Sequence, residues 1–222
     1  MLWSVIICHV HTKELTPPTS SAIIQDIMAL QDAGQATIAY FYFDSRDIDK
    51  QDLRTALSSL LTQLSAYSDS YCDILSHVHQ VHINGAEKPS VGTMITCFKE
   101  MLALPDQGPV YIILDALDEC PNPCRIPSTR IQVLAFLRDL FSLQLPNLHI
   151  CVTSRPDFDI RTTLEPLASY RISIHDQNGQ KKDIEDYIRS SVYSGSSVLM
   201  KRWRERDKEW VIDTLSKRAD GM

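Results

Sequence analysis

Glycine is scarce in this sequence, with only 7 among 222 residues, and the first of them is Gly34. A loop that wraps a phosphate group needs glycines, because its backbone must turn tightly and approach the ligand closely. The stretch before Gly34 therefore excludes a phosphate-binding loop of the form GxxGxGK[ST]. Its one lysine, Lys13, is followed by glutamate, and Pro17 and Pro18 remove two backbone donors.

Net positive charge and long apolar runs are also missing. The net charge of −6 argues against a general nucleic-acid or membrane-surface binder, since both need a basic face. The apolar run Leu2–Cys8 is far shorter than a membrane span, and it has neither a preceding basic residue nor a small-residue cleavage site. We therefore expect a strand there and no association with membranes.

The cysteines do not follow the spacing of a secreted disulfide framework. Three of them, Cys97, Cys120 and Cys151, lie in or beside apolar runs, where a reduced cysteine behaves as a small hydrophobic residue. A reducing, cytoplasmic location follows from this pattern. The segments "CHVH" (Cys8–His11) and "CPNPC" (Cys120–Cys124) match no common zinc spacing, so no zinc is expected.

Apolar runs predict five strands, namely Leu2–Cys8, Thr37–Phe43, Val110–Leu114, Leu148–Ser154 and the shorter, alternating Tyr170–Ile174. The middle three are apolar at nearly every position, which is typical of parallel strands covered on both faces. Helical spacing of apolar residues occurs between them, within 23–28, 53–64, 131–141, 184–192 and 210–215. The sequence thus predicts an α/β domain with a mostly parallel sheet and helices on both faces. Loops are expected at His82–Gly92 and Cys120–Arg130.

Polar side chains follow three of these strands. They are Asp44, Arg46 and Asp47 after the second, Asp115, Asp118 and Glu119 after the third, and Thr153, Ser154 and Arg155 at the end of the fourth. Ligands of open parallel sheets bind beyond the carboxyl ends of the strands. We therefore expect a binding site there, although any one of these residues alone is typical of a solvated loop.

Each of these side chains suits a part in nucleotide chemistry. Magnesium takes one or two carboxylates together with phosphate and water, which makes Asp115 its expected ligand. Asp118 or Glu119 can orient a water molecule, and Arg155 can face a terminal phosphate. Three carboxylates this close repel one another unless they are solvated or paired. Arg155 or Arg46 is the expected counter-charge.

The segment "VYIILDALDEC", followed further along by "LPNLHICVTSRP", resembles the NACHT class of signal-transduction NTPases. The resemblance is greatest to fungal NLR-like proteins with a nephrocystin-like N-terminal NTPase domain, and it covers about residues 20–222. The segments "SAIIQDIM", "AYFYFD", "LSSLLTQLS" and "GQKKDIEDYI" add to it.

This resemblance implies a P-loop NTPase-like sheet that binds and slowly hydrolyses ATP or GTP with magnesium, as a switch for oligomerisation. It implies that Asp115, Asp118 and Glu119 form the Walker B element and that Arg155, within "TSRP", is a sensor arginine. Asp115 and Thr153 would contact the cofactor, and Asp115 would hold the magnesium.

The expected organisation is a divergent segment at 1–19 in place of the phosphate loop, an NTPase core at 20–200, and the start of a helical region at 201–222. We expect this fold to be incomplete at both ends. Two explanations of the missing loop stay open: a degenerate paralogue, or a gene fragment whose first twenty residues come from a misjoined exon or a truncated reading frame.

Loss of the loop has a calculable effect on affinity. Hydrogen bonds to a charged group contribute about 1.5–3 kcal/mol each, so losing three costs roughly a thousandfold to a millionfold in affinity. We expect weak nucleotide binding, no measurable NTPase activity, and a role through other protein domains or self-association. The alternatives are a working switch that holds phosphates with Lys13 and the helix beginning at Ser20, or a fragment without function.

Overall fold

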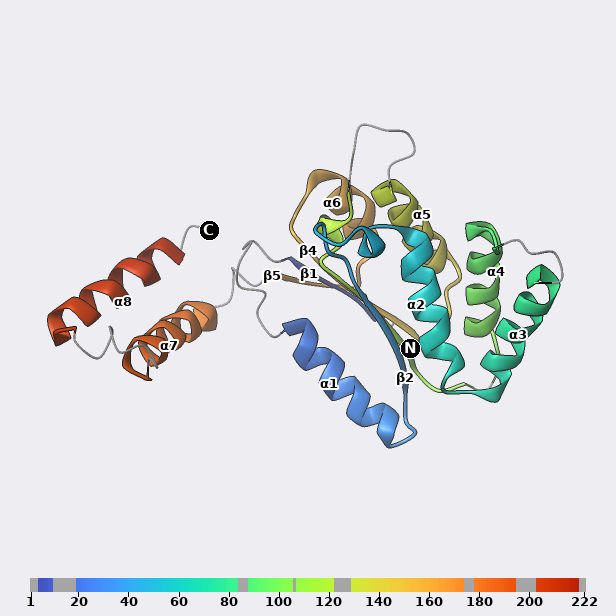
Figure 1. Cartoon of the computed structure of the whole chain (residues 1–222), viewed down its shortest axis with the longest axis horizontal. Coiled ribbons are helices and arrows are strands. Elements are labelled where there is room, and N and C mark those ends of the chain that lie inside the picture. Colours follow the sequence, from blue (N-terminus) through green and yellow to red (C-terminus); the bar gives the residue numbers. More distant parts are fainter. Residues whose placement is uncertain are drawn as a thin grey trace. The chain divides into compact units, whose positions relative to one another are not determined.

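The structure is a computed structural model, and it describes residues 4–9, 19–83, 88–105, 107–121, 129–173, 178–194 and 203–219. Its strands are β1 (Ser4–His9), β2 (Thr37–Tyr42), β3 (Val110–Asp115), β4 (Leu148–Ser154) and β5 (Tyr170–Ser173). They form one five-stranded sheet in the order β2-β3-β4-β1-β5 (Figure 1). The pairs β2/β3, β3/β4 and β4/β1 are all parallel, which confirms the predicted α/β class.

The helices fill the connections that parallel strands require. They are α1 (Thr19–Asp32), α2 (Leu53–Ser65), α3 (Asp69–Ile83), α4 (Val91–Leu102), α5 (Thr129–Ser142), α6 (Phe158–Leu164), α7 (Asn178–Ser194) and α8 (Glu205–Ala219). Short 3₁₀ turns are η1 (Ile48–Lys50), η2 (Leu117–Glu119) and η3 (Glu165–Leu167).

The predicted loop His82–Gly92 is wrong at both ends, because α3 continues to Ile83 and α4 begins at Val91. The Ser90 side chain accepts a hydrogen bond from the Thr93 N–H and so starts α4 where glycine and proline suggested a loop. The predicted loop Cys120–Arg130 ends earlier than expected, since α5 begins at Thr129. Residues 122–128 of that segment lie outside the described residues.

Helix α2 follows its sequence pattern closely. Asp52 caps its first turn by accepting a hydrogen bond from the Thr55 N–H at 2.7 Å. The six apolar residues that recur at helical spacing are all buried, namely Leu53, Ala56, Leu57, Leu60, Leu61 and Leu64. This stripe fixes which side of α2 faces the sheet.

The two faces of the sheet carry different helices (Figure 1). On one face, Ile24 of α1 packs with Ile38 of β2 and Ile113 of β3. On the other, α2, α4 and α5 pack over the alternate residues of the same strands, such as Ile112 and Leu114. Strands buried on both faces explain why the central runs are apolar at nearly every position.

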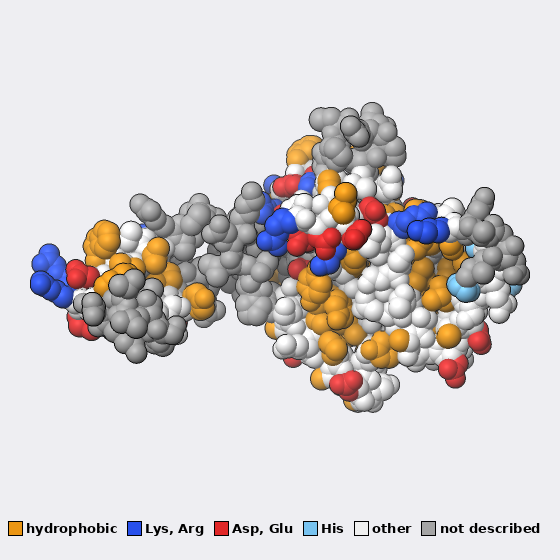
Figure 2. All heavy atoms as spheres, viewed as in Figure 1, with side chains coloured by type: hydrophobic (Ala, Val, Ile, Leu, Met, Phe, Trp, Pro, Cys, Tyr) orange, Lys and Arg blue, Asp and Glu red, His pale blue; other side chains and the backbone are white. Residues whose placement is uncertain are grey.

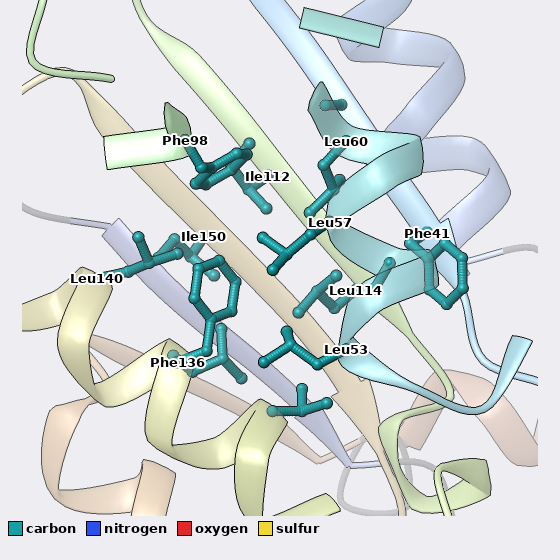
Figure 3. Close-up of a cluster of buried hydrophobic side chains, with 14 of the residues drawn as sticks. Phe41, Leu53, Leu57, Leu60, Phe98, Ile112, Leu114, Phe136, Leu140 and Ile150 are labelled. Carbon is teal, nitrogen blue, oxygen red and sulfur yellow. The ribbon is translucent and has the colours of Figure 1, made fainter. Parts of the chain in front are cut away.

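The larger core lies between the sheet and α2, α4 and α5. Figure 3 shows Leu57 of α2 facing Ile112 and Leu114 of β3, with Phe98 and Phe136 beside them. The rings of Phe98 and Phe136 meet edge to face, with their centroids 5.7 Å apart. This core anchors the strands whose carboxyl ends carry the predicted site.

The chain divides into two compact units, one comprising residues 1–10 and 15–172, the other 11–14 and 173–222. The sheet with α1 to α6 belongs to the first unit, apart from the last residue of β5. In the second unit α7 packs against α8, and Arg189 forms an ion pair with Glu209 at 2.9 Å. The predicted division at residues 1–19, 20–200 and 201–222 stays a prediction.

Candidate functional site at the carboxyl ends of the strands

The carboxyl ends of β2, β3 and β4 lie at the same end of the sheet, because the three strands are parallel neighbours. The end of β1 joins them, since His9 pairs with Ser154. After β3 the chain turns sharply at Ala116, whose φ of 54° lies in the left-handed region that few non-glycine residues adopt. Figure 2 shows acidic and basic side chains gathered together in this region, beside α6.

Asp115 and Thr153 are in direct contact. The buried hydroxyl of Thr153 donates a hydrogen bond to Asp115 Oδ1 at 2.5 Å and accepts one from the Ala116 N–H at 2.9 Å. These two bonds join the ends of β3 and β4 and fix the position of one Asp115 oxygen. The sequence grouped Asp115 and Thr153 as cofactor contacts, and the structure brings them together.

Asp118 and Arg155 form an ion pair. Arg155 Nε lies 3.1 Å from Asp118 Oδ2, and the Arg155 backbone N–H donates to Asp118 Oδ1 at 3.0 Å. Arg155 therefore serves as a counter-charge, as predicted. Burial nevertheless raises the pKa of Asp118 above its ordinary value, because loss of solvent outweighs what Arg155 supplies.

Glu119 and Arg46 have separate partners. Glu119 Oε2 accepts hydrogen bonds from the backbone N–H of Ser45 at 2.9 Å and from its hydroxyl at 3.0 Å, which ties η2 to the end of β2. Arg46 forms its ion pair with Asp44 and lowers the pKa of that carboxyl to about 2 through hydrogen bonds. Asp47 caps η1 and pairs with Lys50. Arg46 thus neutralises none of the three clustered acids by direct contact.

Arg130, at the start of α5, connects the loops that follow β3 and β4. Its Nε donates to the Cys120 carbonyl at 2.9 Å and its Nη2 to the Asp118 carbonyl at 2.5 Å. Its Nη1 lies 2.7 Å from Asp157 Oδ2 and 3.4 Å from Asp159 Oδ1. The Arg130 side chain is only 8% exposed, so these contacts hold it within the fold. Arg130 therefore sets the separation between the segments that carry Asp118 and Arg155.

Sequence reasoning missed three residues of this region, Ser45, Arg130 and Gln51. The backbone carbonyl of Gln51 accepts a hydrogen bond from the buried thiol of Cys120. Ser45 lies between residues that the strand-end pattern did select, and a search for hydroxyls next to carboxylates would have included it. Arg130 follows the proline-rich segment 121–127, and nothing local indicates that its side chain is buried.

Some predicted features fall outside the described residues. Lys13, His11 and Cys124 are among them, and the side chain of Cys8 is not described. Within the part of the chain that is described, no group of three or more His, Cys, Asp and Glu side chains can hold a metal ion. The helices in the described ranges all lack the length and the apolar composition that a membrane span requires.

These contacts do not fit a magnesium nucleotide. Both Asp118 oxygens are engaged by Arg155, so neither group is turned toward a water or a terminal phosphate. Asp115 retains the oxygen chemistry of a magnesium ligand, and Thr153 holds one of its two carboxylate oxygens. The chain that leaves β1 beside Ser154 has no glycine with which to enclose phosphates.

We predict that the Asp118→Asn variant gains stability relative to the natural protein as the pH rises. An aspartate whose pKa is raised on folding binds more protons in the folded state than in the unfolded state. The contribution of Asp118 to the free energy of unfolding is fully present when the pH lies below its ordinary pKa of 3.8. This contribution is lost as the pH rises through the raised pKa of the folded state. Asparagine does not titrate and keeps an acceptor for the Arg155 N–H.

Urea unfolding of both proteins from about pH 3 to about pH 7 tests this prediction. The difference in unfolding free energy should shift in favour of Asp118→Asn toward neutral pH. A shift in favour of the natural protein would mean that the ion pair with Arg155 outweighs the effect of burial.

Solved structures that are similar to this chain include two ORC proteins. They include the Aeropyrum pernix ORC1 protein in complex with DNA, with a TM-score of 0.50 and 14% identity over 83% of this chain and 43% of that chain. The ADP form of the Aeropyrum pernix ORC2 protein has a TM-score of 0.47 and 11% identity over 99% of this chain and 53% of that one. The chain thus spans about half the length of these proteins.

The likeness to the ORC1 protein shows the fold alone, which is an α/β sheet flanked by helices. No curated protein matches the chain significantly. A family model described as "Nephrocystin 3, N-terminal" matches residues 19–155, which is more than half of the chain. The match begins at Thr19, within the glycine-free stretch that precedes Gly34, and ends at Arg155, so it includes all three acids and Thr153. This chain therefore belongs to the family of nephrocystin 3 N-terminal domains.

Proposed function

We propose that this chain is a NACHT-type signalling module that has lost nucleotide binding and acts through contacts with other protein domains or with a second copy. The ion pair between Asp118 and Arg155 carries this proposal. In a working site these two groups would face a water and a terminal phosphate. Here they pair with each other, so each of the two charges has a counter-charge without a ligand.

The rest of the strand-end network supports the same role. Thr153 bonds Asp115 and Ser45 bonds Glu119, so each of the three acids has a protein partner. A network of satisfied polar groups rigidifies the ends of three strands. We propose the cytoplasm as its location, since Cys97 and Cys120 are buried thiols that form no disulfide.

Titration with a fluorescent ATP analogue and its GTP counterpart, with and without magnesium, tests the loss of binding. We expect no saturable binding at micromolar concentrations and no measurable hydrolysis, because the donors of the glycine loop are missing. Asp115→Ala and Lys13→Ala are the matched variants. Micromolar, magnesium-dependent binding that both variants lose would instead establish a working switch with Lys13 as its phosphate contact.

A further inference from the structure

The outer edge of β2 is the feature that carries a further inference. Among the described residues β2 is the last strand on its side of the sheet, so within that part of the chain one edge of its backbone has no neighbouring strand. The N–H groups of Thr37 and Phe43 donate to the carbonyls of Pro109 and Asp115 on the β3 side. Because successive residues alternate, Ile38, Tyr40 and Tyr42 direct their N–H and carbonyl groups outward.

Two glutamines occupy this edge. Gln63 of α2 accepts a hydrogen bond from the Tyr40 N–H at 3.1 Å and donates one to the Tyr40 carbonyl at 2.8 Å. Gln31 of α1 accepts one from the Ile38 N–H at 2.8 Å. The two helices lie on opposite faces of the sheet, so each sends one amide side chain over the same edge (Figure 1).

The Gln63 amide imitates a peptide group of an adjoining strand. In an antiparallel pair, two residues directly opposite each other exchange both N–H···O bonds, and Gln63 makes this exchange with Tyr40. The hydroxyl of Ser59 bonds Gln63 Nε2 at 3.0 Å and fixes its orientation. A glutamine held in this way excludes a strand from the position that it fills.

The sequence of β2 makes the covered edge suitable for pairing with a second copy. The strand, "TIAYFY", has no charge, proline or glycine, and it is rich in β-branched and aromatic residues. An antiparallel pair centred on Tyr40 of both copies sets Tyr42 opposite Ile38, a favourable aromatic and β-branched pair. It also sets Asp44 opposite Ala36 and so avoids facing like charges.

We propose that the edge of β2 is a self-association surface for a second copy of this chain, and that Gln31 and Gln63 keep it closed. When the two glutamine amides are displaced, the backbone N–H and carbonyl groups of Ile38 and Tyr40 become free to bond the backbone of β2 in the other copy. The result is a two-fold symmetric dimer with one continuous sheet. The inference rests on the geometry of β2 alone and holds whether or not nucleotide binds.

The experiment compares the natural protein with the double variant Gln31→Leu, Gln63→Leu by sedimentation velocity from low to high micromolar concentration. In the natural protein the Gln31 and Gln63 amides compete with the incoming strand for the backbone groups of β2, and the leucines of the double variant do not. The double variant is therefore expected to dimerise about tenfold to a hundredfold more tightly. Hydrogen exchange of the Tyr40 amide should be fast in its monomer and slow in its dimer. Gln25→Leu, at an exposed position of α1, controls for added apolar surface.

A third substitution tests the surface itself. Lysine on an exposed edge strand opposes strand addition, so Tyr42→Lys in the double variant should restore the monomer. A double variant that stays monomeric, or that forms larger assemblies despite Tyr42→Lys, would overturn the proposal. If the double variant does not fold, the two single variants decide the question in the same measurement.

Discussion

Replacing residues 10–18 by a loop of the form GxxGxGKS is expected to raise the affinity for Mg-ATP at least about a thousandfold, into the micromolar range. The segment between β1 and α1 has no glycine, and β1 ends beside β4, where the acids and Thr153 lie. A glycine loop there supplies backbone N–H donors and a lysine to the phosphates. Calorimetric titration of the folded chimera measures the gain.

Asp115→Ala in the same chimera is the matched control. It removes the expected magnesium ligand and leaves the new loop intact, so binding should persist but lose its dependence on magnesium. A folded chimera that gains no affinity would show that the missing loop does not account for weak binding. The cause would then lie in the acids, whose contacts with Arg155 and Ser45 would exclude the ligand.

The Arg130→Met variant is expected to lower the free energy of unfolding by about 3 kcal/mol. The substitution leaves the carbonyls of Cys120 and Asp118 without their donor, inside a region where the Arg130 side chain is only 8% exposed. Asp157 is 42% exposed and regains water, which keeps the loss at the low end of the range for broken buried pairs. Urea unfolding of the variant and the natural protein measures this difference in the free energy of unfolding.

Arg138→Met provides the control, because Arg138 lies on the exposed side of the same helix. Its effect should stay within about 0.5 kcal/mol. Arg130→Lys keeps a charge near Asp157 but cannot reach both carbonyls, so an intermediate loss is expected. Equal stability of the Arg130→Met and Arg138→Met variants would mean that the Arg130 contacts do not hold the two loops together.

Strands and the longer helices were predictable from local pattern. The strand Leu148–Ser154 has the predicted bounds, and every apolar residue of the α2 pattern is buried. Helices α4 and α6 were not predicted, and of α3 the sequence indicated only a polar helix end at 77–82. In α3, polar residues and three histidines dilute the apolar stripe, and α4 begins right after a segment that reads as a loop. In the structure α4 buries an apolar stripe at helical spacing, which consists of Met94, Cys97, Phe98, Met101 and Leu102, and both α3 and α4 contact α2.

For the site, the sequence could select residue types but not partners. Asp115 with Thr153 and Asp118 with Arg155 are separated by 38 and 37 positions. Their grouping followed from the rule that parallel strands end together. Whether Arg155 faces a ligand or Asp118 depends on the turn at Ala116, because this turn positions Asp118. No local sequence pattern predicts that an alanine adopts the left-handed conformation found there.

By itself, the sequence determined the α/β class, the strands that end in acids and the absence of a glycine loop. Each of these follows from the type and spacing of residues close together in the chain. Only the tertiary structure decided that Arg155 neutralises Asp118, that Arg130 is buried between two loops, and that Gln63 closes the edge of β2. Those contacts join distant segments, and their geometry is set by how helices pack on the two faces of the sheet.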